Sequence, residues 1–71
     1  MENIKIGKIF MYNEIEFKIT YINKEKNRFT IEPVDKESII PVNQIINIDN
    51  ENFKIEYINH GKKRITLKMN L

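Results

Sequence analysis

The stretch FKITYINKEKNRFT, residues 17–30, returns thirty-six positions later as FKIEYINHGKKRIT, residues 53–66. Nine of the fourteen aligned positions are identical, and the alignment needs no gap. At the same spacing the match extends over residues 4–35 and 40–71, where eleven of thirty-two positions are identical. The sequence therefore predicts two tandem copies of one supersecondary unit.

Each copy has the pattern of three β-strands joined by polar turns. In residues 14–22, Ile15, Phe17, Ile19 and Tyr21 alternate with polar side chains, as in a strand that buries one face. A second alternating run follows the polar turn NKEKN, and a third precedes the first, with a bulge or tight bend expected at Gly7. Since no helical period extends over ten residues, we expect an all-β protein.

The two copies are expected to pack against each other within a single domain, residues 1–71. An isolated three-stranded meander is only marginally stable, and its free edges favour aggregation. Packing of the copies as a sandwich, or closure into a small barrel about a pseudo-two-fold axis, avoids both problems. The short strands and tight turns resemble those of small SH3-like and Tudor-like barrels, and this resemblance implies no particular site residues.

The alternation also predicts a core. Its members are Ile4, Ile6, Phe17, Ile19, Tyr21, Phe29, Ile31, Val42, Phe53, Ile55, Tyr57, Ile65 and Leu67. Exposed tyrosines could stack on nucleic-acid bases, but the alternation favours a core position for Tyr21 and Tyr57. It directs Ile22 and Ile58 outward, which indicates either a register shift near the strand end or an exposed contact surface.

The residue inventory is unfavourable for enzymatic chemistry. The chain has no cysteine and a single histidine, His60, so it cannot supply the ligands of a tetrahedral zinc site. Ser38 is the only serine, so a serine nucleophile with a histidine base would require Ser38 and His60 to lie in contact. We therefore predict a non-enzymatic protein without cofactor or metal. The absence of cysteine and of any long apolar run favours a cytoplasmic location and argues against a membrane partner.

Basic residues mark the candidate binding surface. The net charge is +2, and the whole excess lies in residues 36–71. Both copies place cations at the turn after the repeated YIN and on the outward rows of the strands. The candidate partner-binding residues are Lys18, Lys24, Lys26, Arg28, Lys54, Lys62, Lys63 and Arg64.

Two functions fit this pattern. One is a binding module that contacts nucleic acid or a nucleoprotein complex through basic hairpin tips. The other is a protein-interaction or inhibitor protein, encoded for example by a phage or mobile element, that acts through a strand edge or the exposed isoleucines. A homodimer is compatible with either, and the sequence leaves the choice between nucleic acid and protein open.

Overall fold

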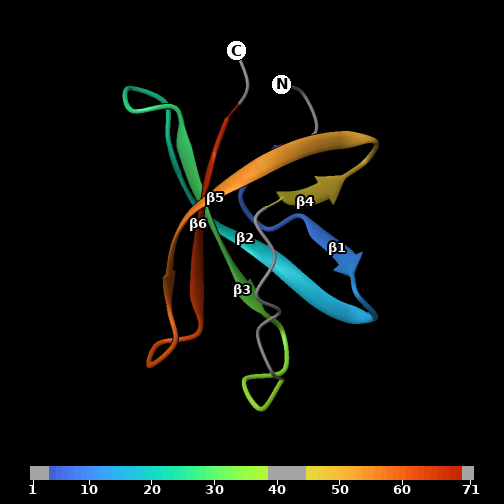
Figure 1. Ribbon diagram of the computed structural model, residues 1–71. Helices are drawn as coiled ribbons and strands as arrows, with labels where there is room; N and C mark the ends of the chain where they lie inside the picture. The colour runs from blue at the N-terminus through green and yellow to red at the C-terminus, as the bar shows by residue number, and fades with distance from the viewer. Residues whose placement is uncertain (1–3, 39–44, 70–71) are drawn as a thin grey trace.

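The computed structural model describes residues 4–38 and 45–69, which form six antiparallel strands in one sheet (Figure 1). The strands are β1 (Ile9–Tyr12), β2 (Ile15–Asn23), β3 (Arg28–Pro33), β4 (Ile45–Ile48), β5 (Glu51–Asn59) and β6 (Arg64–Lys68). Their order in the sheet is β1-β2-β3-β6-β5-β4. The sheet curls until β1 lies beside β4, where the Tyr12 hydroxyl donates a hydrogen bond of 3.0 Å to the Ile45 carbonyl.

This nearly closed barrel confirms the predicted small all-β fold. Within residues 4–38 and 45–69, no helix is long and apolar enough to cross a membrane.

The strands of the two halves correspond at a spacing of thirty-six residues. β1, β2 and β3 begin at residues 9, 15 and 28, and β4, β5 and β6 begin at residues 45, 51 and 64. In the ladder between β3 and β6, Thr30 pairs with Thr66, and these two residues are also equivalent in the sequence. A pseudo-two-fold axis therefore passes between them, so the structure is compatible with the predicted internal repeat.

The outer hairpins use the same turn in both halves. Asn13 and Glu14 join β1 to β2 with φ values of 52° and 64°, and Asp49 and Asn50 join β4 to β5 with 50° and 68°. Two central residues with positive φ define the type I′ turn, whose twist matches that of the strands it connects. The two short hairpins are therefore geometrically equivalent.

Gly7 forms the predicted bulge ahead of β1. Its φ is 93°, and the Lys8 N–H closes a turn by donating to the Lys5 carbonyl at 3.1 Å. The Gly7 N–H donates to the Ile19 carbonyl at 2.8 Å, and the Ile19 N–H donates to the Lys8 carbonyl at 2.9 Å. Gly7 and Lys8 thus lie opposite the single residue Ile19, and two residues opposite one is the defining feature of a β-bulge. The equivalent position, Asn43, lies outside the described residues.

A second bulge occurs at equivalent positions of β2 and β5. The register shifts between Ile19 and Tyr21 in β2 and between Ile55 and Tyr57 in β5. In β2 the extra residue is Thr20, because its neighbours on either side pair with consecutive residues of β3. One extra residue reverses the side to which all following side chains point.

These bulges overturn part of the predicted core. Tyr21 and Tyr57 are 56% and 62% exposed, so their assignment to the core is wrong. Ile22 and Ile58 are partly buried and pack against the core, so the expected outward isoleucine surface is wrong as well. Of the two interpretations that the sequence left open, the register shift is confirmed.

The core lies inside the barrel, and it contains four buried residues that the alternation did not predict, Phe10, Ile46, Ile48 and Met69. Its buried members are Ile4, Phe10, Phe17, Ile19, Phe29, Ile31, Ile46, Ile48, Phe53, Ile65, Leu67 and Met69. The predicted Ile6 is 66% exposed because the turn at Gly7 interrupts the alternation, while Ile55 is only half-buried. Val42 lies outside the described residues. The rings of Phe29 and Phe53 meet edge to face with centroids 5.1 Å apart.

Candidate nucleic-acid interface

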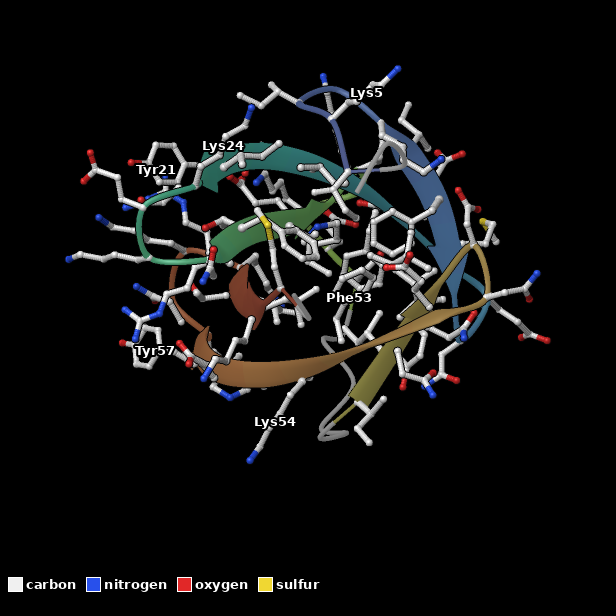
Figure 2. All side chains as sticks on the ribbon, turned by 90° about the horizontal axis from the view of Figure 1, so that it is seen from above. Lys5, Tyr21, Lys24, Phe53, Lys54 and Tyr57 are labelled. Atoms are coloured by element: carbon white, nitrogen blue, oxygen red, sulfur yellow. The ribbon has the colours of Figure 1, made fainter. Side chains whose placement is uncertain are left out.

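Four outward side chains form one row across the four central strands. Tyr21 on β2 pairs with Thr30 on β3, Thr30 pairs with Thr66 on β6, and Thr66 pairs with Tyr57 on β5. Neighbouring strands lie about 4.8 Å apart, which places the two tyrosine backbones about 14 Å from each other. Figure 2 shows both tyrosines on the same side of the barrel, directed away from the core around Phe53.

We call the outer surface of β2, β3, β6 and β5 the tyrosine face. It consists of Glu16, Lys18, Thr20, Tyr21, Asn23, Arg28, Thr30, Glu32, Asn52, Lys54, Glu56, Tyr57, Asn59, Arg64, Thr66 and Lys68. Its five cations outnumber its three carboxylates, so it carries a positive excess equal to the net charge of +2 of the whole chain. Positive charge around exposed aromatic rings is typical of surfaces that hold a phosphate backbone and stack its bases.

The cations are ordered by the strand register. Arg28 pairs with Lys68, and Lys68 pairs with Lys54, so three cations form a row parallel to the tyrosine row. On the other side of the tyrosine row, Lys18 pairs with Glu32 on β3, and Arg64 lies within 3.5 Å of the same carboxylate. Cations therefore lie on both sides of the tyrosine row.

Ion pairs orient both arginines on this surface. The Arg28 Nε atom lies 2.6 Å from Glu56 Oε2, and the Arg64 Nε atom lies 3.5 Å from Glu32 Oε2. Lys36 forms a second ion pair with Glu32. The Arg28 and Arg64 side chains are 46% and 52% exposed, and ion pairs of such exposed groups contribute less than about 1 kcal/mol to stability.

Glu32 is the most strongly partnered carboxylate of the face. The hydrogen bond from Lys36 lowers the pKa of Glu32 below its ordinary value, although partial burial opposes the change. A hydrogen bond from Thr20 and the charges of Lys36 and Arg64 lower this pKa further. The Glu32 side chain is therefore ionised at neutral pH, where its two oxygens act only as hydrogen-bond acceptors.

Two open hollows lie on either side of Glu32. The first has a volume of about 310 Å³ and is lined by Thr20, Tyr21, Thr30, Glu32 and Arg64. The second has a volume of about 270 Å³ and is lined by Lys18, Thr20, Glu32, Pro33, Val34 and Lys36. Both lie near the lower end of the range of about 300–1,000 Å³ that is usual for small-ligand sites.

The structure distributes the eight sequence-predicted residues over three places. Lys18, Arg28, Lys54 and Arg64 lie on the tyrosine face. The turns that carry the other four lie at opposite ends of the barrel (Figure 1), because β3 and β6 run antiparallel beside each other. Each turn contains two of these lysines: Lys24 and Lys26 between β2 and β3, and Lys62 and Lys63 between β5 and β6. The two basic tips therefore do not meet in one patch.

Local hydrogen bonds fix these two tips in the same way. The side-chain oxygen of Asn23 accepts a hydrogen bond of 3.2 Å from the Lys26 N–H. At the equivalent position, the side-chain oxygen of Asn59 accepts one of 3.1 Å from the Lys62 N–H. Lys63 also donates a hydrogen bond of 3.0 Å to the Ser38 carbonyl, so its ammonium group is already engaged with the loop after β3.

Sequence reasoning missed the tyrosines and Lys68 as site residues. The available signal was the pair of adjacent apolar residues, Tyr21 with Ile22 and Tyr57 with Ile58, repeated in both halves. Strict alternation cannot bury both members of such a pair, so an extra residue within the strand was the simplest explanation. That explanation also frees the tyrosine for contact with a ligand.

A second surface lies at the seam of the barrel. Ile9 and Met11 on β1 and Ile45 on β4 are 53%, 61% and 54% exposed, and their two strands lie beside each other. Grouped apolar side chains on edge strands are typical of contact surfaces.

Other chemistry has little support in the described part of the chain. Within it, no three histidine or carboxylate side chains gather where they could hold a metal ion. His60 is exposed in the turn between β5 and β6. Comparisons with protein-family models, with curated proteins and with solved structures gave no significant match.

Proposed function

We propose that this protein is a non-enzymatic module that binds single-stranded nucleic acid across the tyrosine face. The observation that carries the proposal is the row Tyr21–Thr30–Thr66–Tyr57, with cations on both sides of it. A single strand leaves the faces of its bases free to stack on aromatic rings, whereas a duplex hides them. A cytoplasmic location, where such strands occur, belongs to the same proposal.

The cations supply the remaining contacts. Arg28 can form a fork to one phosphate, while Lys54 and Lys68 act as point charges on its neighbours. The two hairpin tips lie beyond the tyrosine face at opposite ends of the barrel (Figure 1), and their lysines extend its positive charge. The tips thus lengthen a binding track instead of forming the site itself, and neither a cofactor nor a second copy of the chain is required.

The proposal is tested by fluorescence anisotropy with labelled single strands and a duplex of the same length. Tyr21→Ala and Tyr57→Ala should each weaken single-strand binding about 5- to 150-fold, because each stacked base contributes about 1–3 kcal/mol. Both rings are exposed, so both variants should keep the stability of the parent protein. Met11→Ala on β1, outside the tyrosine face, is the matched control and should bind normally.

The dependence of affinity on salt concentration distinguishes binding at the tyrosine face from binding at an apolar surface. The logarithm of the affinity should fall linearly with the logarithm of the salt concentration, and Arg28→Gln should flatten that slope by about 0.7 on a single strand. An absence of single-strand binding at low salt, or full binding by the two tyrosine variants, would show that the proposal is wrong.

A protein partner at the barrel seam is the second candidate. It is favoured by the exposed Ile9, Met11 and Ile45 on the two adjacent edge strands. In that case Met11→Ala, and not the tyrosine variants, should weaken binding, and the interaction should resist salt because apolar contacts are not screened.

A further inference from the structure

The two halves of the tyrosine face differ at positions that the repeat makes equivalent. Thr20 beside Tyr21 corresponds to Glu56 beside Tyr57, and Glu32 corresponds to Lys68. The pseudo-two-fold axis therefore relates a carboxylate on one half to an ammonium group on the other. The two tyrosines present similar rings to a base, but the polar groups next to them differ in charge.

The half around Tyr21 contains the larger of the two hollows beside Glu32. Tyr21, Glu32 and Arg64 line it together with the hydroxyl-bearing Thr20 and Thr30. The Thr20 hydroxyl oxygen lies 3.4 Å from the Thr30 carbonyl oxygen, and the same hydroxyl can donate to Glu32, of whose side chain 17% remains exposed. A base that stacks on the Tyr21 ring thus has a carboxylate within the same hollow.

An ionised carboxylate distinguishes the bases by their donors. The Watson–Crick edge of guanine presents two adjacent donors, N1–H and the N2 amino group, which match the two oxygens of a carboxylate. Adenine and cytosine place a ring-nitrogen lone pair next to their amino group, and uracil and thymine flank their single N–H with carbonyl oxygens. Both patterns bring an acceptor against the carboxylate, which penalises the wrong base.

We propose that the hollow beside Tyr21 is a guanine-selective subsite in which Glu32 reads the base edge while Tyr21 stacks on its face. This inference rests on the proposed function, since it assumes a single strand on the tyrosine face. Binding exchanges the Glu32–Lys36 ion pair for the two base donors. Lys36 and Lys18, which line the adjoining hollow, are then placed to hold the neighbouring phosphate.

The half around Tyr57 differs in charge. Lys68 takes the place of Glu32, and an ammonium group donates to phosphates and to acceptors on any base. The carboxylate of this half, Glu56, is held in an ion pair, with its Oε2 atom 2.6 Å from the Arg28 Nε atom. Lys68 also lies in the row with Arg28 and Lys54, which favours backbone contacts. The bound nucleic acid is therefore recognised by its base at the Tyr21 half, whereas the Tyr57 half binds it without base selectivity.

The test compares a short thymidine-only strand with the same strand carrying one central guanine. We expect the guanine to raise the affinity about 5- to 150-fold, the range for a well-formed bidentate base contact. Inosine, which lacks the N2 amino group, should give a smaller gain. Glu32→Gln should abolish the guanine preference, so that the thymidine strand and the guanine strand bind this variant with equal affinity.

Lys68→Gln, at the equivalent position, is the matched control. It should weaken binding of both strands by the same factor and leave the guanine preference intact. Equal binding of the thymidine and guanine strands by the parent protein, or a preference that survives in Glu32→Gln, overturns the guanine subsite while the proposed function stands. Failure of both strands to bind at low salt overturns the proposed function itself. The inosine comparison changes only the ligand, so it holds even where a variant folds poorly.

Discussion

At the scale of single residues, the environment of each aromatic side chain separates its structural role from its binding role. Phe17 and Phe53 occupy equivalent positions and are fully buried, whereas Tyr21 and Tyr57 are mostly exposed. The Phe17 ring stacks on the Phe10 ring with centroids 5.9 Å apart. The equivalent ring of Phe53 instead meets Phe29 edge to face. The phenylalanines stabilise the barrel, and the tyrosines remain available to a ligand.

This division gives a prediction on stability. Phe17→Ala and Phe53→Ala should each lower the free energy of unfolding by about 3–5 kcal/mol, because each leaves a cavity in a fully packed core. A domain of this size has few kcal/mol to lose, so both variants should be largely unfolded at physiological temperature. Circular dichroism melts provide the measurement. A variant that melts close to the parent protein would show that its ring is not part of the core.

At the scale of elements, the sequence predicted the strands and the bulge at Gly7, but it did not locate the bulges at Thr20 and Glu56. Alternation around Phe17 and around Phe53 located β2 and β5, and Gly7 indicated a bulge because few other residues adopt its positive φ. The bulges at Thr20 and Glu56 have no comparable residue signature, since threonine and glutamate are ordinary strand residues. The adjacent pairs Tyr21–Ile22 and Tyr57–Ile58 indicate that the alternation breaks, but the strand pairing decides at which residue, and with it the faces of both tyrosines.

The hairpin turns allow a prediction at this scale. Glu14 adopts a φ of 64° in the type I′ turn between β1 and β2, a conformation that costs a residue with a β-carbon about 1–2 kcal/mol. Glu14→Gly should therefore raise the free energy of unfolding by up to about 1 kcal/mol, after allowance for the greater freedom of glycine in the unfolded chain.

Asn50→Gly in the equivalent turn is the matched comparison. Asparagine tolerates positive φ better than glutamate, so this change should stabilise the protein less. Urea unfolding of the two variants and the parent gives the measurement. A larger gain for Asn50→Gly, or a loss for Glu14→Gly, would contradict the assigned turn geometry.

At the scale of the whole molecule, the pairing of β3 with β6 determines what the basic residues can do. The repeat predicted two related halves, but a repeat alone does not say which strands join them. Antiparallel pairing about Thr30 and Thr66 sends the two basic tips to opposite ends and places the two tyrosines on one surface. The predicted residues Lys18, Arg28, Lys54 and Arg64 are thereby combined with side chains that sequence reasoning had assigned to the core.

The central claim is that one face of the barrel binds single-stranded nucleic acid. The most direct measurement is a titration of the isotope-labelled protein with a short single strand, followed through the amide nitrogen–proton correlation spectrum. We expect the largest shifts on the tyrosine face, centred on Tyr21, Thr30, Thr66 and Tyr57, while the signals of Met11 and Ile45 on the edge strands remain unchanged. Shifts concentrated on those edge strands, or a spectrum that stays unchanged at low salt with excess strand, would contradict this claim.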